Sequence, residues 1–127
     1  MKEFAIKENH LFIKAYSKGK RYVTGNVAVH CLKDLKAGRL KKENPRKEYL
    51  NRIGFTASTK LGDAVVRNRC KRIMRAAYRR LVKDYPVSKG NLIVIVAREG
   101  AVSAGSEQIY RDLVKAFSVL GLISEAS

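Results

Sequence analysis

Residues 63–84, DAVVRNRCKRIMRAAYRRLVKD, are the stretch that decides the fold. At about 100° per residue on a helical wheel, the apolar side chains gather on one arc: Val66, Cys70, Ile73, Met74, Ala77 and Leu81. Asp63 suits the N-cap, because its carboxylate accepts hydrogen bonds from the first turn and complements the helix dipole. Pro86 follows Asp84 and stops the pattern. The stretch therefore predicts a long amphipathic helix that packs through one arc.

The opposite arc of this helix is basic. It carries Asn68, Lys71, Arg72, Arg75 and Arg79, with Arg67, Arg69 and Arg80 at its borders, and no acidic residue lies between Asp63 and Asp84. Like charges at four-residue spacing destabilise a helix by about 0.2–0.5 kcal/mol per pair. An anionic partner would remove this repulsion, and the predominance of Arg favours bidentate phosphate contacts. The pattern indicates nucleic-acid binding rather than a merely solubilising face.

The composition of the whole chain agrees with this interpretation. Its 127 residues predict a single domain over 1–127. The 27 Lys and Arg residues against 11 Asp and Glu give a formal net charge of +16, which favours a polyanionic partner. A helix with polar side chains could enter a DNA major groove, but no helix-turn-helix, zinc-finger or zipper pattern is present. RNA is read by shape and by stacking of unpaired bases, which the aromatic residues at 12 and 16 would suit. Cys31 and Cys70 lack metal-ligand spacing and are expected to be free thiols. With no signal peptide or membrane span, the expected location is the cytoplasm.

The remaining elements are predicted from periodicity and turn residues. Helices are expected at 9–19 and about 106–120, and strands at 21–32 (with a turn at 25–26), 52–58 and 91–97. On the strand before Lys33, Val27, Val29 and Cys31 should face one way, and Ala28 and His30 the other. Residues 33–51 are basic and polar and predict a long loop. The order α-β-β-β-α-β-α predicts an α+β fold, a two-layer sandwich of helices on a four-stranded sheet.

Residues 60–75, KLGDAVVRNRCKRIMR, resemble the signature of the bacterial ribonuclease P protein subunit, a Gly-Asn-Ala-Val-x-Arg-Asn-Arg-x-Lys-Arg-x-x-Arg run. The similarity extends from about Ile6 to Leu120 and includes Arg52-Ile-Gly-Phe and Val94-Ile-Val-Ala-Arg98. It implies the ribosomal-protein-like fold of that family, with a mixed sheet and a left-handed crossover through the basic helix. About 98% of such crossovers are right-handed, so this expectation rests on the resemblance alone.

The resemblance also implies a function. The chain would be the protein partner of a catalytic RNA that removes the 5′ leader of precursor tRNA, with no membrane and no obligate protein partner. Metal-assisted attack of water on a phosphodiester would belong to the RNA and its Mg²⁺ ions. The protein would bind both the catalytic RNA and the leader of precursor tRNA. The chain itself offers no Ser-His-Asp set, paired carboxylates or metal cluster, so no catalytic or metal-ligating residue and no organic cofactor are expected in it.

Two groups of site residues follow by position from the resemblance. Contacts to the catalytic RNA are expected from Arg67, Asn68, Arg69, Lys71, Arg72 and Arg75, and a leader-binding cleft from Phe12, Tyr16, Ala28, His30 and Lys60. Aromatic rings stack on unpaired bases with about 1–3 kcal/mol per base. Asp63 stands where the family usually has Asn, and His30 where Tyr is common, and both departures bear on these roles.

Several structural interpretations stay open beside the functional ones. Phe12 and Tyr16, at four-residue spacing, are by themselves more typical of a core than of a stacking site, and His30 alone is as typical of a satisfied sheet residue. The stem of Arg67 can pack beside Met74, and Asn68 can orient neighbours or a hydrated metal ion. The alternative function is a ribosomal or other non-catalytic structural RNA-binding protein.

Overall fold

The structure is a computed structural model that describes residues 2–5, 19–33, 49–87 and 91–123. Its strands are β1 (Lys2–Ala5), β2 (Lys20–Val23), β3 (Val27–Lys33), β4 (Tyr49–Ala57) and β5 (Asn91–Ala97). The helices are α3 (Ala64–Asp84) and α4 (Ser106–Val119), with short 3₁₀ turns η1 (Thr59–Leu61) and η2 (Glu99–Val102). The predicted helix at 9–19 falls almost wholly on residues outside the described ranges.

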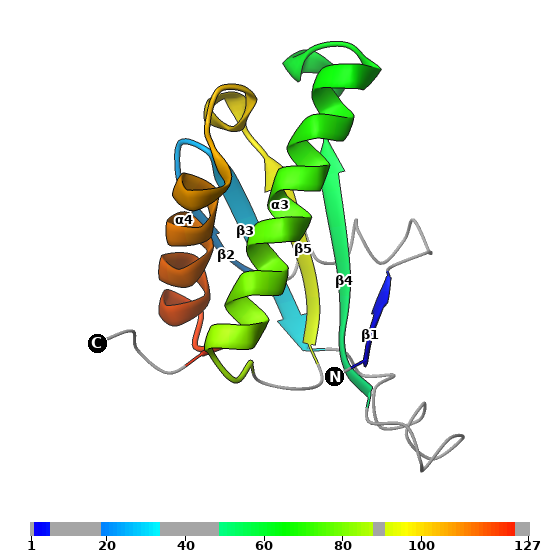
Figure 1. The fold of residues 1–127 in the computed structure, drawn as a ribbon. Coiled ribbons are helices and arrows are strands. Elements are labelled where there is room, and N and C mark those ends of the chain that lie inside the picture. The colour runs from blue at the N-terminus through cyan, green and yellow to red at the C-terminus, as the bar shows by residue number, and fades with distance from the viewer. Residues whose placement is uncertain (1, 6–18, 34–48, 88–90, 124–127) are drawn as a thin grey trace.

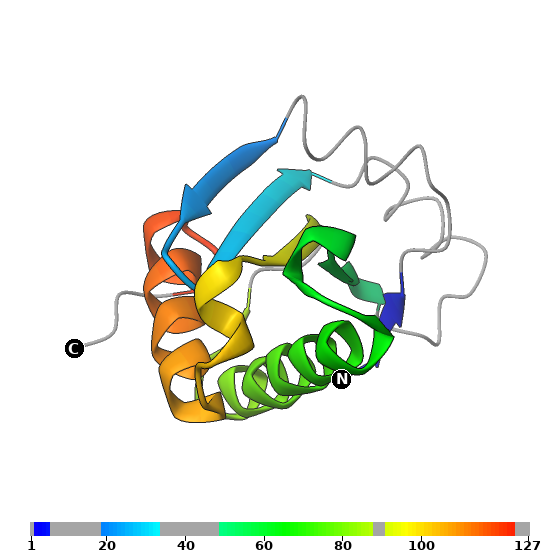
Figure 2. The same ribbon diagram turned by 90° about the horizontal axis from the view of Figure 1, so that it is seen from above.

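The strands form one mixed sheet in the order β1-β4-β5-β3-β2. β4 and β5 run parallel, whereas β3 is antiparallel to both β5 and β2. The α+β class, the mixed sheet and all four predicted strands are thus confirmed. Both helices pack on one face of this sheet (Figures 1 and 2).

The edge of the sheet next to β4 differs from the sequence prediction. β1, which was not predicted, pairs in parallel with β4 and adds a fifth strand. β4 begins at Tyr49 rather than at Arg52, so residues 49–51 of the predicted loop belong to a strand, as does Lys33 at its other end. β1 was missed because a strand of four residues is too short to show alternation. The early start of β4 was missed because its first residues are polar, and they are paired with β1 through Tyr49 and Lys2.

The connection from β4 through α3 to β5 is left-handed. In Figure 1 both strands run upward, α3 lies on the near side of the sheet, and β5 lies to the left of β4. Figure 2, seen from above, places α3 on the same side. This confirms the handedness expected from the family resemblance, against the general preference for right-handed crossovers.

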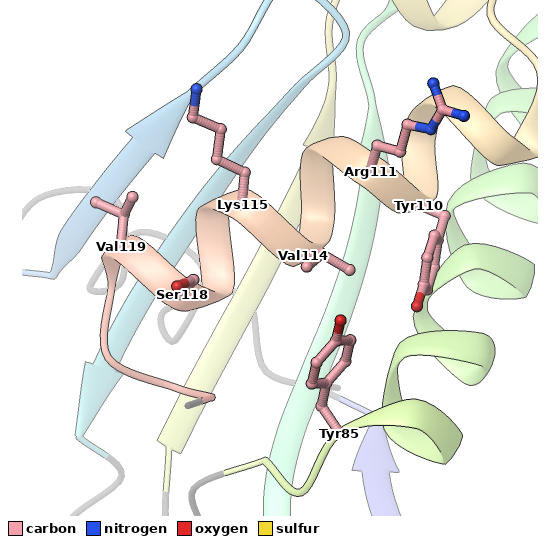
Figure 3. Close-up of a pocket in the computed structure, with 7 residues that line it drawn as sticks. All are labelled: Tyr85, Tyr110, Arg111, Val114, Lys115, Ser118 and Val119. Atoms are coloured by element: carbon pink, nitrogen blue, oxygen red, sulfur yellow. The ribbon is translucent and has the colours of Figure 1, made fainter. Parts of the chain in front are cut away.

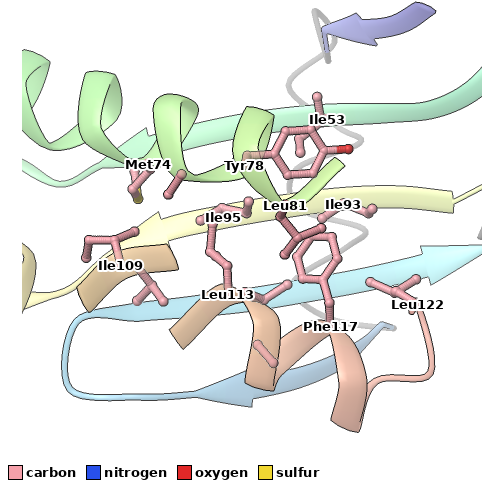
Figure 4. Packing of buried hydrophobic residues seen from close by; sticks show 14 of the residues in the cluster. Ile53, Met74, Tyr78, Leu81, Ile93, Ile95, Ile109, Leu113, Phe117 and Leu122 are labelled. Atoms are coloured by element: carbon pink, nitrogen blue, oxygen red, sulfur yellow. The ribbon is translucent and has the colours of Figure 1, made fainter. Parts of the chain in front are cut away.

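The main core lies between the sheet and the two helices (Figure 4). Val27, Val29 and Cys31 of β3 face this core, as the alternation predicted. On the other face of the sheet, Leu92 and Val94 form a second, smaller cluster with Leu32 and Val96. Cys31 and Cys70 are both buried and both free thiols, as expected.

Helix α3 begins and ends where the sequence predicts. The Asp63 carboxylate accepts a hydrogen bond from the backbone N–H of Val66 at 3.0 Å, which satisfies an unpaired donor of the first turn. Its buried residues are Cys70, Met74, Ala77, Tyr78 and Leu81. Tyr78 was not predicted in the core, and its ring contacts those of Phe55 and Phe117, with centroids 6.0 and 5.9 Å away. Within the described ranges no helix is long and apolar enough to cross a membrane.

Candidate nucleic-acid interface

The basic side of α3 presents most of its charged groups to solvent. Asn68, Arg72, Arg75 and Arg79 are exposed, and Arg67, Arg69 and Lys71 are half-buried. Among the described residues, the ion pairs involve only Arg80 and Arg111 as cations. The six residues predicted to contact catalytic RNA therefore lie on one helix, and their positive charges are not neutralised by carboxylates of the described chain.

Three arginines on this helix also have intramolecular roles. The Nη1 of Arg69 donates a hydrogen bond to the backbone carbonyl of Val102 at 2.8 Å, which ties α3 to η2. The guanidinium of Arg75 lies 5.6 Å from the centroid of the Phe55 ring, a cation–π contact. Arg80 pairs with Glu107 and Asp84 and so joins α3 to α4. Because Arg80 is neutralised within the protein, it is separate from the exposed basic face.

Arg67 differs from its neighbours in burial. Its Nε is buried and has no hydrogen-bond partner among the described residues. A buried donor without a partner costs free energy, so this part of the Arg67 side chain destabilises the protein by itself.

Ala28 and His30 lie on β3 and face away from the helices. Ala28 pairs with Val96 and His30 with Val94 across the β3–β5 ladder, so both belong to the face that holds the second apolar cluster. Burial, and then the nearby charge of Arg21, lower the pKa of His30 below its ordinary value of 6.5. The neutral form of His30 therefore predominates at pH 7, and this form suits stacking on a base. Ala28 is 7% exposed and presents little surface.

The predicted cleft residues are only partly brought together. Ala28 and His30 share a strand and a face, whereas the predicted RNA contacts of α3 lie on the opposite side of the sheet. Lys60 is exposed in η1, just before α3 begins. Phe12 and Tyr16 lie outside the described residues, so their place beside His30 stays a prediction.

Sequence reasoning overlooked Arg21 as a candidate site residue. Arg21 stands directly opposite His30 in the antiparallel β2–β3 pair, and its side chain is exposed. Cross-strand partners share one face of a sheet, so Arg21 adds a cation beside His30. The turn at 25–26, which predicts a hairpin, would have identified this pairing had its register been followed back to residue 21.

Comparison with known proteins agrees with this arrangement. The sequence model of the Ribonuclease P family matches residues 1–121. The ribonuclease P protein component of Symbiobacterium thermophilum is 34% identical over 123 residues, which cover 96% of this chain and 95% of the relative. The component from a Bacillus cereus strain is 32% identical over 121 residues, 95% of this chain and 94% of the relative.

Solved structures show the same fold. The RNase P protein of Staphylococcus aureus superposes with a TM-score of 0.73 and 26% identity, covering 97% of this chain and 100% of that chain. The Thermotoga maritima protein, at 21% identity, matches in fold with a TM-score of 0.63 over 82% of this chain and 86% of its own. The Arg-Asn-Arg run lies on the left-handed crossover helix, and together these matches show that the chain belongs to the ribonuclease P family, as a protein component of the ribonucleoprotein endoribonuclease of tRNA processing.

Proposed function

We propose that the exposed basic side of α3 binds the RNA subunit of ribonuclease P, and that the chain thereby assists endonucleolytic removal of the 5′ leader from precursor tRNA. The observation that carries this proposal is the set of cations on α3 that have no carboxylate partner among the described residues. A folded RNA offers phosphates along its backbone, and guanidinium groups bind phosphates in bidentate fashion.

The second part of the proposal concerns the leader. The sheet face with Ala28 and His30 would hold the single-stranded 5′ leader, together with Phe12, Tyr16 and Lys60. Neutral His30 and the two aromatic rings would stack on bases, and Arg21 and Lys60 would contact phosphates. Such stacking tolerates any base, which fits a leader of varied sequence.

The chemistry of bond cleavage is assigned to the RNA. Within the described ranges no three carboxylate, His or Cys side chains gather into a set that could hold a metal ion, so the proposal gives the Mg²⁺ ions mainly to the RNA subunit. The protein would bind and orient substrate and RNA in the cytoplasm, without an obligate protein partner.

Reconstitution tests the proposal. Purified protein is added to the cognate ribonuclease P RNA, and cleavage of precursor tRNA is measured at low Mg²⁺, where stimulation is expected. Arg72→Ala should weaken assembly, because Arg72 is exposed and its charge is not paired within the described structure. Lys20→Ala is the matched control, since it also removes an exposed cation but lies on β2, at the far edge of the sheet from β4.

The outcomes of these experiments test the binding of the RNA subunit and the binding of the leader separately. If the protein binds RNA yet adds nothing to cleavage, the alternative of a structural RNA-binding protein is correct. If Lys20→Ala weakens assembly as much as Arg72→Ala, the assignment of the RNA subunit to α3 is wrong. Phe12→Ala should reduce the preference for substrates that carry a leader, and an unchanged preference would contradict the leader assignment alone.

A further inference from the structure

A groove on the outer side of the helical layer is independent of both surfaces described above. It has a volume of about 400 Å³ and is lined by Tyr85, Tyr110, Arg111, Val114, Lys115, Ser118 and Val119. Tyr85 is the C-cap of α3, and the other six residues lie along α4 (Figure 3). Its size falls within the usual range for small-ligand sites.

The groove divides into an aromatic part and a cationic part. In Figure 3 the Tyr85 ring points toward Val114 and the Tyr110 ring lies nearby, whereas Arg111 and Lys115, which line the same groove, extend from the opposite edge of α4. Val119, at the end of the groove, is 60% exposed and extends the apolar surface of the groove. A nucleotide has a flat base and an anionic phosphate. The aromatic part of the groove suits the base, and the two cations suit the phosphate.

The charges around the groove favour an anion. Asp84 accepts a hydrogen bond from the Tyr110 hydroxyl and pairs with Arg80, and Glu107 pairs with Arg80 and, at 3.8 Å, with Arg111. Both nearby carboxylates are thus already engaged. Lys115 is exposed and has no carboxylate within ion-pair distance in the described part of the chain.

Arg80 also helps to hold the Tyr110 ring in place. Its guanidinium lies 3.9 Å from the centroid of the Tyr110 ring, so one face of that ring is covered by a cation. The hydroxyl of the same ring is held by Asp84. Tyr110 is therefore fixed in place before any ligand arrives, which lowers the entropic cost of stacking.

We propose that this groove binds one unpaired nucleotide of RNA, with the base against Tyr85, Val114 and Tyr110 and the phosphate at Arg111 and Lys115. The inference rests on the proposed function, since it extends RNA contact from α3 to its neighbour α4. The two helices lie side by side in both ribbon views. An RNA bound on the exposed side of α3 can therefore reach the groove without crossing the sheet.

Site-directed cross-linking tests the location. Ser118→Cys places a thiol in the groove, and a photoactivated cross-linker is attached to it. Ser106→Cys is the matched control, because Ser106 lies on the same helix 12 residues earlier and outside the groove. Irradiation with the cognate ribonuclease P RNA, and separately with precursor tRNA, should cross-link position 118 to an unpaired nucleotide in one of the two. Equal or stronger cross-linking from position 106 would overturn the proposal, as would no cross-link from position 118.

Affinity measurements test the chemistry. Tyr85→Leu removes a ring while keeping an apolar side chain and should weaken binding to the cross-linked RNA about tenfold. Lys115→Glu should weaken it by a similar factor and cannot disturb the core, because its side chain is exposed. Lys20→Glu, an equal charge reversal on β2, is the control for the general electrostatic effect. If Lys115→Glu weakens binding no more than Lys20→Glu, the groove does not bind RNA.

Failure of this inference is distinguishable from failure of the proposed function. If Arg72→Ala weakens RNA binding and the groove variants do not, only the groove assignment is lost. If the unaltered protein binds neither RNA, both proposals are overturned.

Discussion

Arg69 and Val102 are joined by a hydrogen bond in which Nη1 of Arg69 donates to the backbone carbonyl oxygen at 2.8 Å. Val102 is the last residue of η2, and η2 is held in turn by the turn before β3. There the backbone N–H of Gly100 donates to the carbonyl of Gly25 at 3.1 Å. One arginine of the proposed RNA-binding set therefore connects α3, through η2, to the strand that carries His30.

Arg69→Ala is expected to lower the free energy of unfolding by about 1–2 kcal/mol, because it removes a hydrogen bond from a charged donor. Arg72→Ala is the control, since Arg72 is exposed and makes no hydrogen bond or ion pair among the described residues; it should change stability by less than about 0.5 kcal/mol. Urea unfolding measures both. Equal stability of the two variants would show that the Arg69 contact contributes nothing to folding, and RNA affinity measured in parallel separates binding from folding.

Gly100→Ala should destabilise the protein by about 1–3 kcal/mol. A Cβ at this position would lie 2.1 Å from the side-chain oxygen of Asn26 and 2.6 Å from the backbone oxygen of Gly25. Neither atom is free to move, because Asn26 donates to Asp112 and Gly25 accepts from Gly100. Gly25→Ala is the control, since nothing lies within 4 Å of a Cβ there. Thermal unfolding of the pair tests the clash, and similar melting temperatures would contradict it.

The helix at 63–84 shows what local pattern can predict. Its N-cap, its end and all six predicted apolar contacts follow from spacing and from one capping residue, because these depend on neighbours within two turns. Val66 and Ile73 are half-buried rather than fully buried, yet both pack against the core. The prediction failed for Tyr78, whose burial depends on the Phe55 and Phe117 rings of β4 and α4.

The remaining differences also depend on contacts distant in sequence. The hydrogen bond from Arg69 to Val102 spans 33 positions and has no local signal. β1 is defined by its pairing with β4, because four residues carry too little periodicity. The left-handed crossover could not be derived from pattern, and it was expected only from the family resemblance. Similarly, the groove formed by Tyr85 and α4 requires two helices to be packed before its residues meet.

His30 should make stability depend on pH in the acid range. Burial and the Arg21 charge lower its pKa below 6.5 in the folded protein, so the unfolded chain binds this proton more readily. The contribution of His30 to stability is complete above pH 6.5 and is lost as pH falls from there through the lower, folded pKa. An NMR titration should place the His30 midpoint below 6.5, and Arg21→Ala should raise it. A midpoint at or above 6.5 in the unaltered protein would contradict the effect of burial.

Tyr110 should behave oppositely, in the alkaline range. Its hydroxyl donates to the Asp84 carboxylate, and this bond, with a smaller effect of burial, raises the pKa of Tyr110 from 10.0 to about 12. The contribution to stability is complete below pH 10 and is lost as pH rises toward 12. Ultraviolet titration of the unaltered protein and of Tyr110→Phe isolates this residue among the six tyrosines. Asp84→Asn should bring its midpoint back toward 10.0, and an unchanged midpoint would contradict the role of the carboxylate.

Affinity for RNA should depend steeply on salt, because binding releases counterions from each contacted phosphate. With roughly 6–10 phosphate contacts, affinity is expected to fall about 10³–10⁵-fold between about 50 and 200 mM salt. A formal net charge of +16 alone would give general attraction without a defined site. Single variants distinguish the two cases: Arg72→Ala should reduce the slope of log K against log salt by about 0.7–0.9, the value for one contact, whereas Lys20→Ala should leave it unchanged. Both variants lower the net charge by one. Equal reductions of the slope would mean that the RNA responds to total charge, whereas a reduced slope for Arg72→Ala alone would mean that the RNA contacts α3.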